Sequence, residues 1–475
     1  MPTPDVNPCL EIACVELTNV AKAVQIIGGP LLGNNPTAIW ASLIALCHFE
    51  RLVKPARIHK FQVTPKLSSD FVVVGPVGEA QLMIICPSTS PLPALFIGAS
   101  SPQSPLQKFN DHNKCVQTPD PQTTDPSNTA AEVPCSSANI GPGFDVIGLA
   151  LSIWLEVRVD IRDTPTQAPI NFTVTYEGEG AGEVPLSADS NLITRTALYV
   201  LRCHGQRAFP AETKVHITNP IPLGRGLGSS GAAVVAGVVL GNEVGKLGLT
   251  KARMLDYCLM IERHPDNVAA ALYGGFVGTY LNDLSPEDTS RKEIPLSEVL
   301  PEPAGGLDTG LPPPEPPLGI GHYMKFPWAP EIKAIAIIPH FEVATAKARS
   351  VLPDSYSRAD VVFNLQRIAL LPLALGRSPP DAEQIYLAMQ DKVHQPYRQG
   401  LIPGLPEILQ SVTPKSHPGL CGICLSGAGP TILALATENF DGIAKVILDM
   451  FAKKDIKCDW KLLEPAEEGT TVSYS

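Results

Sequence analysis

The sequence predicts an α+β protein of two lobes. From Val133 onward, strand-like and helix-like segments alternate, and a Pro-rich stretch divides them. Hydrophobic residues make up 44% and charged residues 17% of the 475 residues, which excludes a wholly disordered chain. The 48 prolines are about twice the usual share, so we expect long irregular connections. These features predict a largely disordered or irregular extension over 1–131, a first lobe over 132–282, a Pro-rich linker or insert over 283–319, and a second lobe over 320–475.

The first lobe begins with a segment of low strand propensity. Because Ala130–Val133 is weak as a strand, we expect the opening strand to be frayed or missing. Leu151–Ile161 alternates apolar and polar side chains, which predicts a half-buried strand. Further strands are expected at Asn171–Tyr176 and Lys214–Ile217, and helices at Ser190–Arg202, Gly231–Val244 and Lys251–Ile261, the last with Thr250 as its N-cap.

The second lobe shows the same mixture of elements. Its expected strands are Ala334–Ile338, Cys421–Leu425 and Thr431–Ala436, and its expected helices are Phe363–Leu373, Glu383–Lys392 and Ile443–Lys453. Cys421 and Cys424 form a CxxC pair, but a zinc site would need a second pair or nearby histidines. The 11 cysteines are scattered, so we expect reduced thiols rather than a disulfide framework or a metal site.

The charge balance limits the partners of the protein. With 36 basic and 47 acidic residues, the formal net charge is −11, the opposite of what a nucleic-acid binder normally shows. The longest apolar runs, Thr37–Cys47 and Ala232–Leu240, are shorter than the roughly 20 residues that cross a bilayer. The N-terminal residues lack the basic region of a secretory signal. We therefore expect a cytoplasmic protein without a nucleic-acid or membrane partner, and the oligomeric state is left open, a homodimer included.

The strongest local motif is a glycine-rich loop before an apolar helix, PIPLGRGLGSSG at 220–231. Glycines let the backbone approach a ligand closely, and helix N-terminal amides favour phosphate oxygens. A dinucleotide-binding fingerprint is excluded because the preceding apolar strand and the later acidic residue are missing, and no Walker A ending is present. A glycine-rich turn that packs a buried helix is the alternative. The candidate phosphate-binding residues are Pro222, Leu223, Gly224, Arg225, Gly226, Leu227, Gly228, Ser229, Ser230 and Gly231.

Two further small-residue blocks accompany this loop, VPCSSANIGPGFDVIG at 133–148 and LCGICLSGAGPT at 420–431. In order and spacing, the three blocks resemble the three motifs of the GHMP small-molecule kinases, which include galacto-, homoserine, mevalonate and phosphomevalonate kinases. Within that superfamily, the segment NIGPGFD resembles homoserine kinases. The later blocks ERHPDN at 262–267, TAKARSVLP at 345–353 and DKVHQPYRQGLIP at 391–403 resemble them too. The resemblance covers 133–475.

This resemblance implies a two-lobed GHMP kinase fold. Its N-terminal lobe would bind the nucleotide with a left-handed βαβ unit, an exception to the usual crossover rule, and its C-terminal lobe would be ferredoxin-like. The implied reaction is ATP-dependent phosphorylation of the side-chain hydroxyl of L-homoserine to O-phospho-L-homoserine, in threonine biosynthesis, with Mg²⁺. Another GHMP kinase and a non-catalytic sensor that binds ATP and a metabolite are the alternatives.

The resemblance also implies roles for individual residues. The residues matching its substrate site are Asn139, Asp145, His264, Asp266, Asn267, Arg349 and Arg398, of which the two arginines would hold the carboxylate. Asn139 and Asp266 would orient the reacting hydroxyl, Asn191 would lie near the adenine, and Ser230 and Glu262 would contact Mg²⁺.

Each of these positions also has a purely structural interpretation. Asn139 and Asp145 are typical of a Gly-Pro-Gly turn, and His264 and Asn191 of helix starts. The two arginines are also typical of surface ion pairs, and Glu262 of a solvated helix end.

Overall fold

The computed structural model describes residues 128–162, 164, 168–188, 190–283 and 313–474, together with three short strands. These strands, β1 (Val72–Val74), β2 (Leu82–Ile85) and β3 (Leu95–Ile97), form an antiparallel sheet in the order β1-β2-β3. They belong to a unit over 1–117 that is separate from the unit over 118–475. Most of the expected extension and of the expected Pro-rich linker lies outside the described residues.

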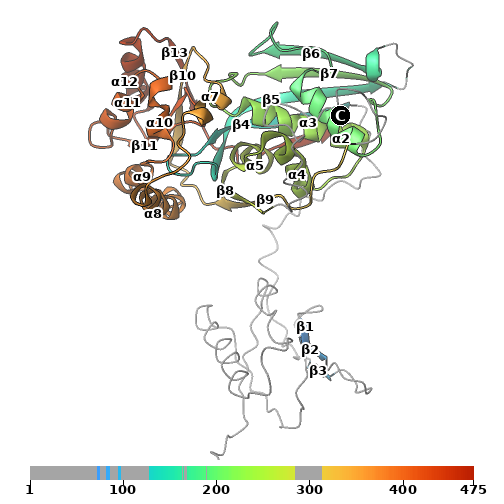
Figure 1. Ribbon diagram of the computed structural model, residues 1–475, viewed down its shortest axis with the longest axis horizontal. Helices are drawn as coiled ribbons and strands as arrows, with labels where there is room; N and C mark the ends of the chain where they lie inside the picture. Colours follow the sequence, from blue (N-terminus) through green and yellow to red (C-terminus); the bar gives the residue numbers. More distant parts are fainter. Residues whose placement is uncertain are drawn as a thin grey trace, which may run out of the picture. The chain divides into compact units, whose positions relative to one another are not determined.

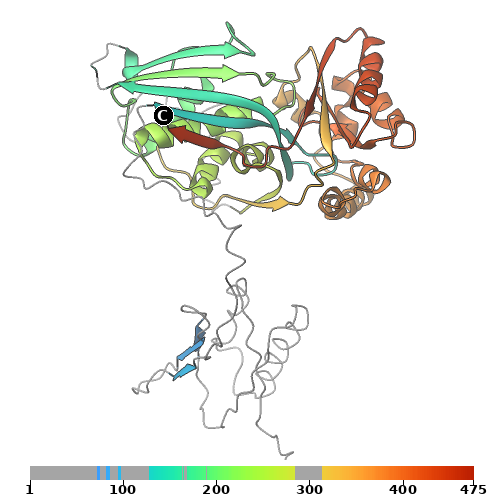
Figure 2. The ribbon, with the colours of Figure 1, turned by 180° about the vertical axis from the view of Figure 1, so that it is seen from behind.

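A seven-stranded sheet forms the back of the first lobe (Figure 2). Its main path runs β14-β4-β5-β7-β6, with β8 paired to β5 and β9 paired to β8. Only β6 and β7 are parallel, and α2 connects them in a βαβ unit. The strands are β4 (Asn128–Ala138), β5 (Ile147–Arg162), β6 (Phe172–Gly178), β7 (Glu212–Asn219), β8 (Phe276–Leu281), β9 (Gly321–Phe326) and β14 (Thr471–Tyr474).

The opening strand is complete, and the expectation that it is frayed or missing is wrong. β4 has 11 residues and pairs with β5 along its length. Its other edge pairs with β14, from Glu132 opposite Thr471 to Thr129 opposite Tyr474. Val133 is fully buried in the core. Pairing on both edges and burial of alternate side chains outweigh the low intrinsic propensity of this segment.

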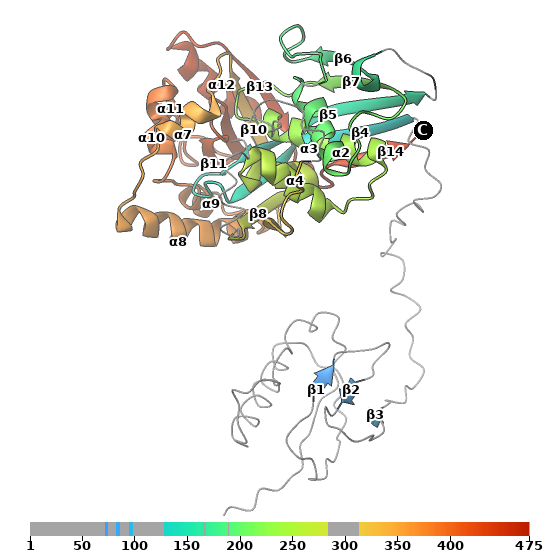
Figure 3. The same ribbon diagram turned by 45° about the vertical axis from the view of Figure 1, so that its right-hand side comes forward.

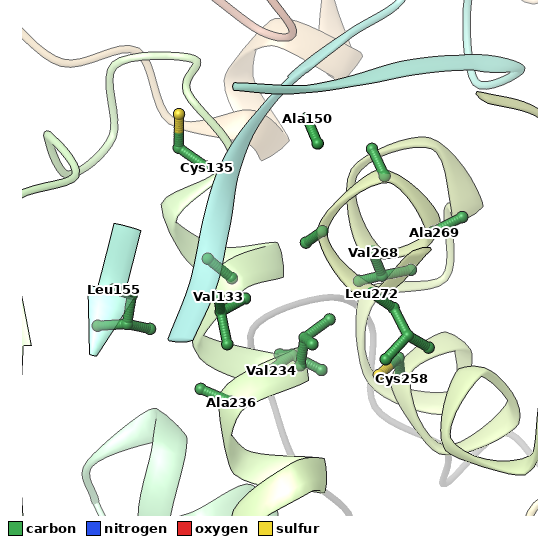
Figure 4. Close-up of a cluster of buried hydrophobic side chains, with 14 of the residues drawn as sticks. Val133, Cys135, Ala150, Leu155, Val234, Ala236, Cys258, Val268, Ala269 and Leu272 are labelled. Atoms are coloured by element: carbon green, nitrogen blue, oxygen red, sulfur yellow. The ribbon is translucent and has the colours of Figure 1, made fainter. Parts of the chain in front are cut away.

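Four helices cover one face of this sheet (Figure 1). They are α2 (Leu192–Cys203), α3 (Ser229–Gly245), α4 (Lys251–Glu262) and α5 (Pro265–Tyr273). The hydroxyl oxygen of Thr250 accepts a hydrogen bond from the backbone of Arg253, which confirms it as the N-cap of α4. In the core between sheet and helices, Val234 of α3, Cys258 of α4 and Val268 of α5 lie near Val133 (Figure 4).

Helix α3 is buried over most of its surface, and small residues let its neighbours come close. A Cβ atom at Gly237 would lie only 2.4 Å from the carbonyl oxygen of Ile193 in α2. The two helices therefore pack nearly backbone to backbone, and α3 lies centrally among the helices of the lobe (Figure 1). This packing fixes the N-terminus of α3, where the glycine-rich loop ends.

The second lobe is a four-stranded antiparallel sheet in the order β11-β12-β10-β13. With helices after its first and third strands, this is the ferredoxin-like order, which confirms the expected fold class. Figure 3 shows α8 along the edge of this lobe. The strands are β10 (Lys333–Pro339), β11 (Leu420–Leu425), β12 (Ile432–Ala436) and β13 (Cys458–Leu463). The helices are α7 (Thr345–Ser350), α8 (Arg358–Leu375), α9 (Ala382–Ala388), α10 (Gln395–Arg398), α11 (Leu405–Ser411) and α12 (Phe440–Ala452).

Strand pairing divides the lobes differently from the expected boundaries. Both β9 and β14 belong to the large sheet, although they lie in the range 320–475 that was expected to form the second lobe. The segment before β9 is also held to the first lobe, since Arg253 pairs with Glu315 at 2.9 Å and donates to the carbonyl of Pro317 at 3.1 Å. None of the helices in the described part of the chain has the length and apolar composition needed to cross a bilayer.

Candidate active site

A cavity of about 500 Å³ lies where the two lobes meet, a size suited to small-molecule ligands. The predicted residues that line it are Asn139, Asp145, Asn191, Leu223, Gly224, Arg225, Gly226, Gly228, Ser229, Ser230, Gly231, Glu262, His264, Asp266, Asn267, Arg349 and Arg398. Two predicted phosphate-binding residues are not among its lining. Leu227 is part of the hydrophobic core and Pro222 is buried, because the loop turns these two side chains inward.

The glycine-rich loop needs its glycines for geometric reasons. Gly224, Gly226 and Gly228 all have positive φ angles, of 63°, 83° and 66°. A Cβ atom at Gly228 would lie 2.2 Å from Oγ of Ser136. The loop ends in the first turn of α3, whose positive dipole end faces the cavity lining at Ser229 and Ser230. The loop therefore packs a buried helix, as its structural interpretation predicts, and it also lines the cavity.

Hydrogen bonds join the three sequence motifs into one unit. Oγ of Ser137 and Oγ of Ser426 are 2.7 Å apart, and Ser426 donates to the carbonyl oxygen of Gly226 at 2.6 Å. Because Ser426 uses its proton in that bond, Ser137 donates to Ser426. Asn139 donates through Nδ2 to the carbonyl oxygen of Gly427 at 3.1 Å. Ser137 and Ser426 therefore support the glycine-rich loop at Gly226.

His264 bridges two buried carboxylates at the start of α5. Its Nε2 is 3.2 Å from Oε2 of Glu262, and its Nδ1 is 3.0 Å from Oδ1 of Asp266. Burial alone would lower the pKa of His264, but hydrogen bonds to these two carboxylates raise it to about 10. His264 is therefore a cation at neutral pH. Asp266 also accepts a hydrogen bond from the backbone of Asn267 at 2.9 Å, so its position is fixed from two sides.

Two arginines of the second lobe approach the first motif. Arg349 forms a bidentate ion pair with Asp145, and this pair raises the pKa of Arg349 against the effect of burial. Arg398 is buried and donates to the carbonyl oxygens of Ala348 at 3.3 Å and Gly427 at 2.8 Å. Burial and the nearby charge of Arg349 lower the pKa of Arg398 to about 10, so it stays charged at neutral pH. The ion-pair interpretation of Arg349 is thus confirmed, inside a cavity rather than on an open surface.

Asn191 is the N-cap of α2, as one of its two interpretations predicts. Its Oδ1 accepts hydrogen bonds from the backbones of Ile193 and Thr194, and its Nδ2 donates to the carbonyl oxygen of Pro185 at 3.1 Å. Oδ1 is therefore engaged by the first turn of α2, and Nδ2 by the loop before it. The cavity lining also includes Leu155, Tyr176, Val184, Pro185 and Leu192.

The donor set at the glycine-rich loop fits magnesium better than a transition metal. Ser230 donates a short hydrogen bond to Oε1 of Glu262, so two hard oxygen ligands lie together at the start of α3. Among the described residues, no group of three or more His, Cys, Asp or Glu side chains is arranged to hold a metal ion. Cys421 and Cys424 are buried free thiols, and burial raises their pKa values to about 11 and about 12, which keeps both protonated at neutral pH.

Several lining residues were not predicted. Phe144, Thr345 and Gly427 lie within the quoted sequence blocks, so their neighbours were the available signal. Glu342 lies outside every block, and a Cβ atom at Gly224 would be 3.0 Å from its Oε2. Its place at the loop depends on the second lobe folding back onto the first, which no local pattern indicates.

Comparisons with known proteins agree with this geometry. Residues 191–275 match the family model described as GHMP kinases N terminal domain. The homoserine kinase of Saccharomyces cerevisiae is 64% identical over 347 residues, which are 72% of this chain and 97% of that protein. The chain belongs to the homoserine kinase family.

Other homoserine kinases are also similar to this chain. The homoserine kinase of Candida albicans is 54% identical, over 72% of this chain and 97% of its own length. The crystal structure of homoserine kinase from Cytophaga hutchinsonii superposes with a TM-score of 0.56 at 25% identity, covering 73% of this chain and 98% of that one. The homoserine kinase family assignment and the predicted GHMP fold are therefore confirmed.

Proposed function

We propose that this chain transfers the γ-phosphoryl group of ATP to the side-chain hydroxyl of L-homoserine, giving O-phospho-L-homoserine and ADP, in threonine biosynthesis. The main support is one cavity that holds a phosphate-binding loop together with two arginines and a carboxylate, in a member of the homoserine kinase family. A substrate with both an ammonium and a carboxylate group matches these charges. A sugar or an isoprenoid alcohol would leave Asp145 or the arginines without a ligand of opposite charge.

ATP would place its phosphates on the loop 222–231 and the N-terminus of α3. In a chain of net charge −11, this local positive potential offsets repulsion of the nucleotide. The apolar lining that includes Tyr176 and Pro185 suits the adenine ring. Asn191 would act there by holding Pro185 in place, because its own polar atoms bond to the protein.

L-Homoserine would bind at the other end of the cavity. Arg398 uses Nε and Nη1 in bonds to the protein and keeps Nη2 for the substrate carboxylate, with Arg349 beside it. Asp145 would accept the substrate ammonium group while it stays paired with Arg349. Asn139, Asp266 and Asn267 would face the reacting hydroxyl.

The reaction needs orientation more than a strong base. The two carboxylates beside His264 raise its pKa, which disfavours it as an acceptor of the hydroxyl proton; it holds Asp266 in place. Phosphoryl transfer runs through a loose transition state in which little proton loss precedes bond formation. Ser230 and Glu262 would hold Mg²⁺, which neutralises charge on the transferring phosphates. Asp266 and Asn139 align the hydroxyl with the γ-phosphorus, and the loop amides stabilise the developing charge.

The test is ADP release by the purified full chain with Mg-ATP and L-homoserine, compared with mevalonate, galactose and L-serine. We expect turnover with homoserine alone, and loss of this turnover when Mg²⁺ is chelated. Turnover with another alcohol would identify a different GHMP kinase. ATP binding without turnover on any of the four would identify a sensor.

We also propose a cytoplasmic location without nucleic-acid or membrane partners, which the acidic charge supports. A homodimer is supported by exposed apolar side chains along α8, among them Leu365, Leu370 and Leu373, at 59%, 55% and 69% exposure. Sedimentation velocity at two protein concentrations tests this, and a monomer at both would contradict it.

A further inference from the structure

One buried histidine links the two halves of the proposed substrate site. His394 is fully buried in the short segment before α10. Its Nε2 lies 2.7 Å from the carbonyl oxygen of Gly141, in the turn of the first motif. Its Nδ1 lies 3.2 Å from Nη1 of Arg398. The first contact crosses from the second lobe to the first, and the second joins the arginine that faces the cavity.

The chemistry of the partners fixes the proton of His394. A guanidinium group only donates hydrogen bonds, so Nδ1 of His394 accepts from Arg398. The ring proton of the neutral form is then on Nε2, which donates to Gly141. Burial lowers the pKa of His394; the charge of Asp391 opposes this effect and the charge of Arg398 adds to it, and the net lowering is in keeping with a neutral ring.

The nearest carboxylate, Asp391, is satisfied without a charged histidine. Its Oδ2 is 3.6 Å from Nε2 of His394, beyond hydrogen-bond distance. Its two oxygens accept hydrogen bonds from the backbones of Val393, His394 and Gln395 at 2.7 to 3.1 Å. The side chain of Asn364 donates to it at 2.8 Å. Asp391 therefore fixes the backbone that carries His394, and the ring of His394 bonds to Gly141 and Arg398 instead.

The turn on the first-motif side carries two proposed substrate ligands. Asn139 and Asp145 flank this turn, and both have positive φ angles, of 75° and 57°, which the surrounding contacts must stabilise. Gly141 has no room for a side chain, because a Cβ atom would lie 2.4 Å from the carbonyl oxygen of Met389. The ring of Phe144 stacks on His394 at 5.4 Å and lies 5.3 Å from the guanidinium carbon of Arg398.

We infer that His394 is a positioning residue that sets the distance between Arg398 and the turn carrying Asn139 and Asp145, and so matches the site to the length of an α-amino acid substrate. The inference rests on the proposed function, because it takes Arg398 as the carboxylate ligand. His394 touches neither substrate nor nucleotide in this assignment. It acts through Nδ1, which accepts a hydrogen bond from Arg398, and through Nε2, which donates one to Gly141.

Two substitutions test the hydrogen bonds of these two atoms separately. In His394→Asn, the amide oxygen takes the place of Nδ1 and keeps the bond from Arg398, while the bond to Gly141 is lost. In His394→Gln, the amide nitrogen takes the place of Nε2 and keeps the bond to Gly141, while the bond from Arg398 is lost. The KM for L-homoserine, the KM for ATP and kcat are measured on the full chain, together with the Tm.

We expect His394→Gln to raise the KM for L-homoserine about tenfold or more, as loss of one charge-assisted hydrogen bond at a carboxylate ligand would. We expect His394→Asn to change this KM little and to lower kcat, because the turn that aligns the hydroxyl is released. The KM for ATP should stay within about twofold in both, since neither bond involves the glycine-rich loop.

A double-mutant cycle and a matched control complete the test. Because His394 acts on the carboxylate through Arg398, adding His394→Gln to Arg398→Ala should raise the KM no further. His340→Gln removes a second-lobe histidine that pairs with Asp459 at 2.9 Å outside the cavity lining, and should leave both KM values unchanged. If His394→Gln does not fold, Asp391→Asn lies outside the cavity lining, weakens the hold on the backbone that carries His394, and should raise the same KM.

The outcomes are distinct. Wild-type turnover with homoserine, combined with unchanged homoserine KM and kcat in the His394 variants and only a lower Tm, would overturn this inference and leave the proposed function standing. Equal increases in the KM values for ATP and homoserine would also overturn it, because they would indicate general loosening. A wild-type chain without homoserine turnover would overturn the proposed function and this inference together.

Discussion

The guanidinium group of Arg349 in α7 forms two parallel hydrogen bonds with the carboxylate of Asp145 in the first motif. Nη1 is 2.9 Å from Oδ2, and Nη2 is 2.8 Å from Oδ1. The two residues are 204 positions apart in sequence, and they join the lobes across the cavity. Each charge is thereby compensated by a protein group. The ammonium group of an amino-acid ligand could compensate part of the charge of Asp145. Its carboxylate could at the same time compensate part of the charge of Arg349.

Arg349→Ala should raise the KM for L-homoserine about 10- to 100-fold, the loss of about 1.4 to 2.7 kcal/mol of binding. The substitution removes a carboxylate ligand and leaves Asp145 without its partner. The KM for ATP should change little, because Arg349 is bound to Asp145 rather than to the glycine-rich loop. Initial rates at varied substrate concentrations measure both constants. An unchanged homoserine KM would remove Arg349 from the substrate site.

Gly228→Ala should lower kcat/KM for ATP by at least about tenfold. The residue has a φ angle of 66°, and the added Cβ atom would meet Oγ of Ser136. Gly400→Ala is the matched control, because this glycine lies outside the cavity lining, its φ angle is not positive, and a Cβ atom there would meet no other atom within 4 Å. It should keep kcat/KM for ATP within about threefold. Equal losses in the two variants would show that the loop does not depend on backbone conformation at Gly228.

The free energy of unfolding should fall between about pH 7 and pH 10, in part because His264 loses its proton. Its pKa is raised to about 10 in the folded protein from an ordinary value of 6.5. The stabilisation is therefore complete below pH 6.5 and is lost as the pH rises through 10. Urea unfolding without Mg²⁺ at a series of pH values measures it. In His264→Gln, the slope over this range should be smaller; an identical slope would mean that His264 is neutral.

Deletion of residues 471–475 should lower the Tm by several degrees. It removes β14, exposes the edge of β4 and disturbs Thr470, whose carbonyl accepts a hydrogen bond from Lys251 at 3.0 Å. Differential scanning calorimetry of the full chain and the deletion measures the change. Tyr474→Phe, which loses only an exposed hydrogen bond to Glu243, is the control and should leave the Tm nearly unchanged.

The sequence motifs locate the site well because each carries its chemistry within a few residues. Gly228 and His264 could be assigned to the cavity from their immediate neighbours. The pairing of Asp145 with Arg349 could not, because a bond over 204 positions depends on how the lobes close. Glu342 was missed for the same reason. The inward side chains of Pro222 and Leu227 follow from the path of the loop, which glycine spacing alone does not fix.

The strand at the start of the first motif shows the limit of local propensity. The segment before Val133 is rich in alanine and has a single charge, so its own residues give little sign of a strand. It is a strand because β5 and β14 supply partners on both edges. The βαβ and ferredoxin-like parts were predictable from the family resemblance, whereas the return of β14 was not visible in any motif.

Because β14 completes the sheet at β4, the order in which the chain is synthesised restricts when the enzyme can become active. The first motif leaves the ribosome early, but the strand that carries it has an open edge until Thr471–Tyr474 follow. The whole ferredoxin-like lobe, which has a second hydrophobic core, is made in between. A chain whose synthesis ended before the last strand would thus contain every proposed catalytic residue. It would lack one strand of the sheet that supports them.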